Sequence, residues 1–214
     1  AILAYFPVSS MLFSLRNDVV AIEYPIQYFI SEGLRNGEFP LWFNTWSMGF
    51  PLQSILSWGV YSTPQMLIGI FISSNIYILH IEFVFFIITS GCCMYKLLKT
   101  HFIADDKNLS LLFACCYMLS GFTVGSSQWL LYITGMTFIP LVIYCLLSLL
   151  KTPSIKYSLL FAVSFFLLLT NVHIYLTLVS SYILIVFLLI YFVHLFLSKK
   201  INQEHNLKVA KQTL

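Results

Sequence analysis

The sequence predicts an all-α fold, a polytopic bundle of about six transmembrane helices, from its composition, its apolar runs and its lysines. Hydrophobic residues make up 59% of the 214 residues and charged residues only 9%. The mean hydropathy is +0.89. Such a chain is solvated mostly by hydrocarbon, so the formal charge of +3 gives no reason to expect nucleic acid as a partner. Its expected surroundings are the lipid bilayer.

Apolar runs that carry almost no charge place the helices, since a span needs about 20 such residues. In chain order they cover residues 1–13, 76–98, 109–124, 130–150, 157–169 and 174–197. The first run is short, which predicts that it is the outer end of a helix and that the chain is an N-terminal part of a longer protein. We expect residues 1–198 to belong to the bundle, and residues 199–214 to be a cytoplasmic basic tail or a connection to further helices.

Basic residues predict the orientation, because cytoplasmic loops gather Lys and Arg. With six spans, all nine lysines fall on one side of the membrane, near the second-to-third connection, near the fourth-to-fifth connection and in the tail. The loop 16–63 is then extracytoplasmic. Segment 64–74 has about half the length of a crossing, which predicts a re-entrant or interfacial segment. Counting this segment as a span would move the lysines that follow it to the same side of the membrane as the loop 16–63.

The extracytoplasmic loop is predicted to contain one amphipathic helix. Pro25 suits the first turn of a helix, and Gly37 suits the position just past its end. The apolar residues between them fall on one face: Ile26, Phe29, Ile30 and Leu34. We expect this helix to lie flat in the outer headgroup layer.

Two acidic residues of this loop are candidates for chemistry. Asp18 follows the first run almost immediately, at the mouth of any cavity between helices; the alternative is a solvated partner of Arg16. Glu23 precedes the helix, so it is either a site residue or a carboxylate that stabilises a helix N-terminus. Together they offer oxygen ligands for Mg²⁺ or Mn²⁺.

Glu82 is predicted to lie six residues inside the second span, about 9 Å below its outer end. An ionisable group at that depth is costly and faces a protein interior or a wet cavity. It is therefore a functional candidate or a protonated Glu that is hydrogen-bonded to another helix. His80 and His173 are candidate partners, and each has the alternative of a satisfied interface histidine.

The remaining polar and aromatic patterns exclude several chemistries. All four tryptophans fall at the predicted outer face, as an aromatic belt or as rings that stack on a sugar or line a lipid groove. The five cysteines lie inside predicted helices, without a CxxC pattern, which indicates packing rather than a metal site or disulfides. The chain has no Walker loop and no GxGxxG, HExxH or GxSxG motif, so soluble-type nucleotide chemistry is not expected.

The loop carries a series of short motifs: Asp18, Glu23-Tyr24-Pro25, Gly37-Glu38-Phe39-Pro40-Leu41-Trp42, Asn44, Met48-Gly49-Phe50-Pro51-Leu52 and Gly59-Val60-Tyr61-Ser62-Thr63-Pro64. In order and spacing they resemble the first external loop of bacterial YfhO-type membrane proteins. Ser120-Gly121-Phe122, Gln128-Trp129-Leu130 and Pro140-Leu141 are similar to the third and fourth helices of that family. The resemblance extends to about residue 190. It departs where Phe43 stands between Trp42 and Asn44.

The resemblance implies a glycosyltransferase of the GT-C fold in the bacterial cytoplasmic membrane. Such an enzyme moves a sugar from a polyprenyl-phosphate carrier to a cell-envelope polymer or lipid acceptor at the outer face. Carried over by position, the catalytic base is Asp18. The leaving phosphate needs positive charge, and Arg16 and Arg35 are the only cations that the sequence places on the external side. The other expected substrate-binding residues are Glu23, Trp42, Asn44, Glu82, Gln128, Trp129 and His173. A divalent cation, Mg²⁺ or Mn²⁺, is an optional addition held by Asp18 and Glu23.

Two other classes of function stay open from the residues. In a transporter or flippase, Glu82 would couple transport to protons and the external loop would be a lid. The absence of paired Gly- or Pro-broken spans and of a second buried acid in the spans speaks against it. In a noncatalytic assembly partner, Asp18 would be dispensable.

Overall fold

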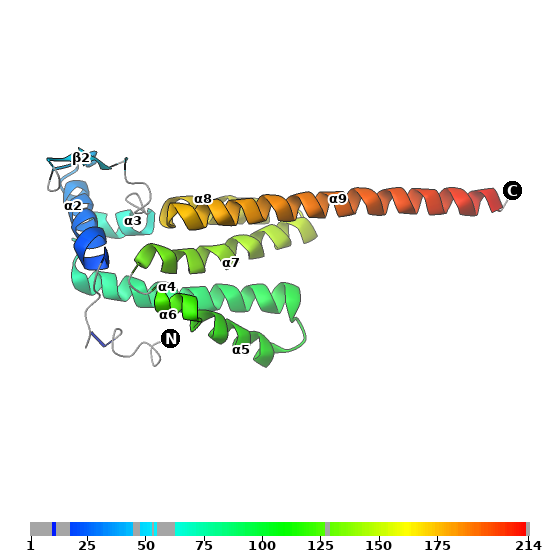
Figure 1. Ribbon diagram of the computed structural model, residues 1–214, viewed down its shortest axis with the longest axis horizontal. Coiled ribbons are helices and arrows are strands. Elements are labelled where there is room, and N and C mark those ends of the chain that lie inside the picture. The colour runs from blue at the N-terminus through cyan, green and yellow to red at the C-terminus, as the bar shows by residue number, and fades with distance from the viewer. Residues whose placement is uncertain are drawn as a thin grey trace. The chain divides into compact units, whose positions relative to one another are not determined.

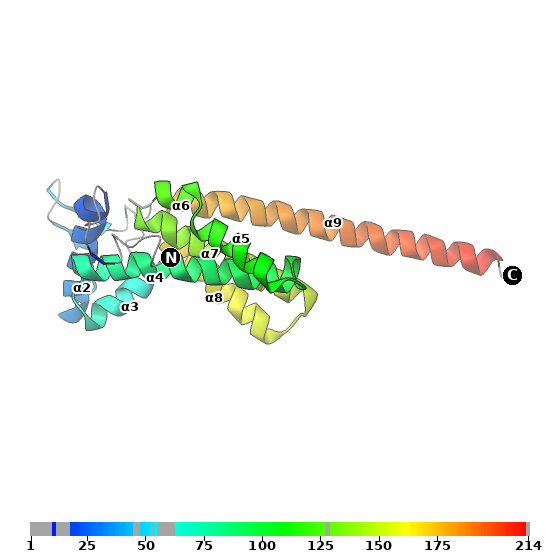
Figure 2. The ribbon, with the colours of Figure 1, turned by 90° about the horizontal axis from the view of Figure 1, so that it is seen from below.

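The computed structural model describes residues 10, 11, 18–44, 48–52, 54, 63–126 and 129–212 (Figures 1 and 2). The chain divides into two compact units, Ala1–Thr177 and Leu178–Leu214. Within the described residues, one two-stranded hairpin accompanies the helices. The elements are η1 (Val19–Glu23), α2 (Tyr24–Arg35), β1 (Trp42–Phe43), β2 (Phe50–Pro51), α3 (Thr63–Phe71), α4 (Ile76–Leu97), η3 (Leu98–Phe102), α5 (Lys107–Met118), α6 (Gly121–Gly125), α7 (Leu130–Lys151), α8 (Ile155–Asn171) and α9 (Ile174–Gln212).

The prediction of an all-α bundle is confirmed at this level. Among the described residues, four helices are long and apolar enough to cross a membrane: Ile76–Phe102, Lys107–Gly125, Leu130–Lys151 and Ile174–Leu197. The fifth expected run forms the shorter α8 of 17 residues. The expected run 1–13 lies almost entirely outside the described residues, so the number of six spans stays a prediction. The stretch Lys107–Gly125 is interrupted where α5 ends and Ser120 caps α6.

Helix α7 is the centre of the bundle in the first unit, since it packs between α4 and α8 (Figure 1). Polar side chains cross both of these contacts. Thr137 Oγ1 donates to the backbone oxygen of Phe86 at 2.8 Å, and Thr134 Oγ1 donates to the backbone oxygen of Asn171. In an apolar solvent such bonds satisfy hydroxyl groups that water does not reach. They fix the position of α7, and with it the start of α7, relative to its neighbours.

Residues 18–35 form one continuous helix, whose first turn is the π-helical η1 and whose remainder is α2. Pro25 lies in the first turn of α2. Gly37, with φ of +76°, follows the end, where a residue without a Cβ adopts the left-handed region without strain. The helix that the sequence predicts between these two residues is confirmed.

The apolar face of α2 has a protein partner. Ile26 and Ile30 are buried in one cluster with Phe43 of β1 and with Leu52, which follows β2. Phe43 also contacts Phe29 edge to face, with ring centroids 5.1 Å apart. We expected this face to rest in the headgroup layer, and the hairpin covers it instead. The reason is that the aromatic residues downstream of Gly37 supply apolar surface close in the chain.

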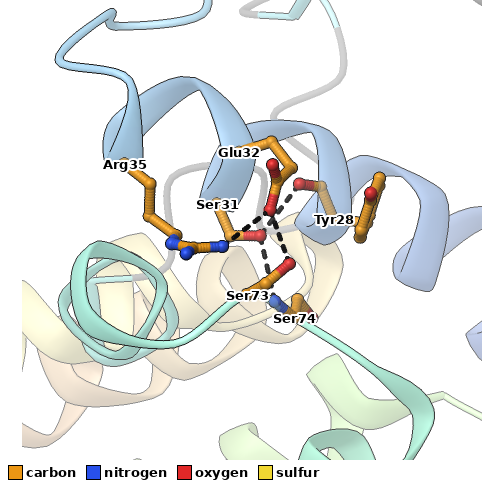
Figure 3. Close-up of polar contacts among 6 residues, drawn as sticks. All are labelled: Tyr28, Ser31, Glu32, Arg35, Ser73 and Ser74. Carbon is orange, nitrogen blue, oxygen red and sulfur yellow. Dashed lines mark hydrogen bonds and ion pairs between the residues drawn. The ribbon is translucent and has the colours of Figure 1, made fainter.

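The far half of α2 is tied to the turn between α3 and α4 (Figure 3). The backbone N–H of Ser74 donates to Ser31 Oγ at 3.0 Å. Ser73 Oγ donates to Glu32 Oε1 at 2.6 Å, and Arg35 Nη1 reaches the same oxygen at 3.1 Å. Helix α3 itself has nine residues, which agrees with the prediction that segment 64–74 does not cross the membrane as a full span.

Candidate functional site

Asp18 and Trp129 meet although 111 positions separate them. Trp129 Nε1 donates a hydrogen bond to Asp18 Oδ2, and the two atoms are 2.6 Å apart. Trp129 is the N-cap residue of α7, and Asp18 is half-buried at the start of the helix 18–35. The indole therefore fixes the orientation of the carboxylate that the resemblance assigns as the base.

Glu23 lies over the first turn of α7. Its side chain is 4% exposed, and the backbone amides of Leu130 and Leu131 donate to its carboxyl group. The N-terminal amides of a helix have no partner within the helix, and the helix dipole favours negative charge there. The Oε2 atom of Glu23 is buried and has no hydrogen-bond partner among the residues that the structure describes. Glu23 is thus a carboxyl group at a helix N-terminus, as one of the two interpretations expected. The helix is α7, however, and not α2, which directly follows Glu23 in the chain.

Burial raises the pKa of Glu23 from its ordinary value of 4.5 to about 8. The nearby carboxyl groups of Asp18 and Glu82 raise the pKa further, and the amides of Leu130 and Leu131 lower it in part. At neutral pH this carboxyl group is therefore mostly protonated. The site then combines the carboxylate of Asp18 with a neutral acid one helical turn away.

A run of neighbouring aromatic rings leads away from the Asp18 carboxylate. The ring centroids of Trp129 and Tyr132 are 5.5 Å apart, and Tyr132 stacks on His173 at 5.0 Å with an interplanar angle of 22°. His173 stacks in turn on Tyr175 at 5.1 Å. Burial lowers the pKa of His173, which keeps its ring neutral near pH 7. We call Trp129, Tyr132, His173 and Tyr175 the aromatic ladder.

Glu82 faces the protein interior, as its depth in the second span predicts. Its side chain is 6% exposed, and Gln65 Nε2 donates to Glu82 Oε2 at 3.3 Å. The hydrogen bond that the structure gives Glu82 therefore comes from α3, and neither candidate histidine supplies it. His80 Nδ1 lies 2.7 Å from the backbone oxygen of Ile76. This contact agrees with the interpretation of His80 as a histidine whose hydrogen bonding is satisfied within the protein. His173 belongs to the aromatic ladder.

Three predicted site residues of the loop lie elsewhere. Arg35 is at the opposite end of the helix 18–35 from Asp18, roughly 25 Å away at 1.5 Å per residue, and pairs with Glu32. Trp42 is exposed on the hairpin, where its indole packs over Gly49, and Asn44 follows the same strand. The described contacts do not bring Arg35, Trp42 or Asn44 to Asp18, and their assignment as substrate-binding residues stays a prediction. Arg16 and Gln128 lie outside the described residues.

The residues do not fit the Mg²⁺ or Mn²⁺ site that Asp18 and Glu23 suggested. Asp18 uses one oxygen for the Trp129 N–H, and Glu23 is mostly protonated at neutral pH. Within the described part of the chain, no group of three His, Cys, Asp or Glu residues is arranged to hold a metal ion. We therefore assign no step to a cation.

Sequence reasoning missed Tyr132 and Gln65. Tyr132 follows Trp129 by three positions, and this spacing puts both rings on one side of a helix, so a periodicity argument finds it. Gln65 precedes Glu82 by 17 positions and reaches it across a turn, which leaves no signal in the sequence. Of the five cysteines, Cys145 is buried, whereas Cys92 and Cys116 are exposed.

Comparisons of the chain with protein-family models, with curated proteins and with solved structures find no match. What the chain is therefore follows from its fold and its site. It is an all-α protein with several apolar helices long enough to cross a membrane, which is compatible with a multi-pass membrane protein.

Proposed function

We propose that the protein is a membrane glycosyltransferase that moves a sugar from a polyprenyl-phosphate carrier to a cell-envelope acceptor at the outer face of a bacterial cytoplasmic membrane. The observation that carries the proposal is the 2.6 Å hydrogen bond from Trp129 Nε1 to Asp18 Oδ2. The residue that the YfhO-type resemblance assigns as the base is held by the start of a central helix. A general base needs this kind of positioning.

Asp18 takes the proton of an acceptor hydroxyl group in this reaction. Trp129 occupies Oδ2, so Oδ1 is the oxygen that accepts the proton. The acceptor oxygen then forms a bond to the anomeric carbon as the bond from that carbon to the carrier phosphate oxygen breaks. The carrier phosphate leaves with the electron pair. General-base assistance of this type contributes about 10² to 10⁴ in rate.

The neutral state of Glu23 suits an anionic donor. Two carboxylates side by side would repel the carrier phosphate. Because Glu23 is mostly protonated at pH 7, it adds little negative charge next to Asp18 where the helix 18–35 meets the start of α7. Of the two predicted cations for the leaving phosphate, Arg35 is too far from Asp18. The other, Arg16, lies outside the described residues and stays the predicted cation.

The aromatic ladder provides the surface for a sugar. Tyr132 and His173 are stacked nearly parallel beside Trp129, and flat amphipathic rings cover the apolar face of a sugar well. This supports the stacking alternative for Trp129 over a membrane belt alone. The indole then has two tasks, to orient Asp18 through its N–H and to contact the donor with its face.

The test compares wild type with Asp18→Asn in the full-length protein in native membranes. Transfer from undecaprenyl-phosphate sugars to envelope polymers should fall by about 10² to 10⁴, because the amide cannot accept the proton. Glu38→Gln is the matched control, since Glu38 is an exposed carboxylate of the same loop. Equal transfer by wild type and a folded Asp18→Asn would remove Asp18 from the role of base.

A proton-coupled transporter is the second candidate. The predicted spans contain one buried acid, Glu82, and the structure adds a second one from the loop, Glu23. Glu23 and Glu82 are 4% and 6% exposed, and their carboxyl groups interact electrostatically. In this case Glu82→Gln should abolish proton-driven uptake in proteoliposomes, while Asp18→Asn should leave it intact. Uptake that persists unchanged in Glu82→Gln would end the transporter proposal.

A further inference from the structure

A small open pocket lies where α2, α3 and α4 meet, outside the set of residues that binds Asp18. Its interior has a volume of about 20 Å³, which is room for one group of the size of a water molecule or an ammonium group. Most of its wall is apolar. The polar residues that line it come from all three elements: Gln27, Ser31, Gln65, Ser74 and Glu82.

The first feature of this pocket that calls for a ligand is the carboxyl group of Glu82. It is 6% exposed, and its hydrogen bond comes from the neutral amide of Gln65. Within the described part of the chain, the ion pair that forms joins Arg35 to Glu32, so no described cation balances Glu82. A buried carboxylate without a counter-charge is strongly disfavoured, and a bound cation would remove this cost.

The second feature is the hydroxyl group of Ser74. Ser74 is 8% exposed, and its Oγ is buried without a hydrogen-bond partner among the described residues. Its neighbour Ser31 has no proton left to donate to it, because Ser31 Oγ donates to the backbone oxygen of Tyr28 while it accepts from the backbone N–H of Ser74 (Figure 3). Native structures rarely leave a buried hydroxyl unpaired. Ser74 Oγ and the carboxyl group of Glu82 can both accept a hydrogen bond from a group in the pocket, although Glu82 Oε2 already accepts one from Gln65.

The outer surface of α3 indicates where such a ligand comes from. Leu67, Ile70 and Phe71 are 56%, 45% and 80% exposed, and α3 carries no charged residue. In a membrane this surface contacts acyl chains. The described residues that line the pocket include no Lys or Arg, so the pocket does not select an anion.

We propose that this pocket binds the primary ammonium group of a membrane phospholipid. Glu82 is the counter-ion, Ser74 Oγ accepts a second N–H, and Gln65 holds the carboxylate in place. The acyl chains lie along the exposed face of α3. The proposal does not depend on glycosyl transfer, because none of these residues contacts the Asp18 carboxylate or the aromatic ladder.

The test uses the full-length protein purified from nanodiscs that contain equal amounts of phosphatidylethanolamine, phosphatidylcholine and phosphatidylglycerol. Native mass spectrometry counts the lipids that stay bound. Phosphatidylethanolamine should be enriched about tenfold over phosphatidylcholine, whose quaternary ammonium has the same charge but no N–H to donate. Glu82→Gln should abolish this enrichment, and Glu38→Gln, an exposed control, should keep it.

Three outcomes would overturn the proposal. Equal retention of phosphatidylethanolamine and phosphatidylcholine by wild type would remove the ammonium N–H as the recognised group. Equal retention of phosphatidylglycerol would assign the pocket to hydroxyl donors. Free ethanolamine, added to phosphatidylcholine nanodiscs, tests whether a soluble amine binds as well as the lipid. If it raised the thermal unfolding midpoint of the protein as much as phosphatidylethanolamine does, a lipid ligand would be contradicted.

Ser74→Ala is a second variant that removes one hydroxyl group and leaves every charge in place. It should lower the enrichment severalfold, because one acceptor for the ammonium is lost. Unchanged enrichment in both folded variants would contradict the site. If Glu82→Gln does not fold, the wild-type comparison of the three lipids and Ser74→Ala still decide.

Discussion

Single carboxyl groups show most clearly how this chain uses its few charges. Asp18, Glu23 and Glu82 differ by environment: Asp18 accepts an indole N–H, Glu23 lies over helix amides and Glu82 accepts from a glutamine amide. Two acids of the loop and one acid of a predicted span therefore occupy three distinct environments. The position of each acid in the sequence predicts its depth, whereas its partners depend on which helix ends meet.

Glu23→Gln should make the stability of the protein less dependent on pH. The pKa of Glu23 is about 8 in the folded protein and near 4.5 in the unfolded chain. Between these values the folded state keeps a proton that the unfolded state has released, so the free energy of unfolding decreases as pH rises, by up to about 1.4 kcal/mol per pH unit. Below pH 4.5 and above pH 8 this contribution is constant.

The measurement is the thermal unfolding midpoint in detergent at half-unit steps from pH 4 to pH 9. Wild type should lose stability between pH 4.5 and pH 8, and Glu23→Gln should lose less across the same window. Glu38→Gln should follow wild type, because Glu38 is exposed. Identical profiles for wild type and Glu23→Gln would contradict burial of an ionisable Glu23.

Trp129→Phe separates the two tasks of the indole. Phenylalanine keeps an aromatic ring next to Tyr132 but has no N–H for Asp18. The loss of a hydrogen bond to a charged group should cost about 1.5–3 kcal/mol in unfolding free energy. It should also lower the turnover number more than it changes the Michaelis constant for the donor.

Trp42→Phe is the control for this change, because Trp42 is exposed on the hairpin. A steady-state assay with varied donor concentration separates the two kinetic constants. If Trp129→Phe changed only the Michaelis constant, the indole would act by stacking alone.

At the scale of elements, short-range sequence patterns predicted where α2 begins and ends. They did not predict which elements contact one another. Pro25 and Gly37 mark the ends of α2 because each acts on its own backbone. The prediction that the headgroup layer covers the apolar face of α2 was wrong. Periodicity indicates that a face is buried, but it does not indicate what covers that face. The break between α5 and α6 at Ser120 lies inside an apolar run that shows no helix breaker other than Gly121.

Gly69→Ala should loosen the contact between α2 and α3. A Cβ at Gly69 would lie 3.1 Å from Ser31 Cβ and 3.3 Å from Ser31 Cα, and a backbone atom cannot turn away as a side chain does. Overpacking of this kind should lower the unfolding free energy by about 1–3 kcal/mol. Thermal unfolding in detergent measures the effect.

Gly121→Ala is the matched control, since a Cβ there meets nothing within 4 Å. In open helix positions this substitution is neutral or stabilising by about 0.4–1 kcal/mol. Equal effects of the two substitutions would show that α2 and α3 are not in close contact.

At the scale of the whole molecule, composition was enough to predict an all-α chain with membrane-length helices. The density of apolar residues forces backbone groups to pair within helices. The candidate site was predicted in part: Asp18, Glu23, Trp129 and His173 come together, whereas Arg35 does not. Which helix ends meet depends on long-range packing that no local pattern contains.

Two single-cysteine variants test the predicted orientation. In a background without the five native cysteines, Glu38→Cys should react with a membrane-impermeant maleimide added to intact cells. Asp105→Cys, in the connection before α5, should react only after the membrane is opened. Both positions are exposed in the structure, so buried thiols do not confuse the result. Reaction of both cysteines in intact cells would contradict the orientation that the lysines predict.

The helix 18–35 is anchored to the bundle near both of its ends. Asp18 and Glu23 hold one end to the start of α7, and Ser31 and Glu32 hold the other to the turn between α3 and α4. Because both ends are held, the helix cannot rotate about the contacts at one end unless the contacts at the other end break. Movement of this helix as a hinged cover would therefore require both sets of polar contacts to break in the same event.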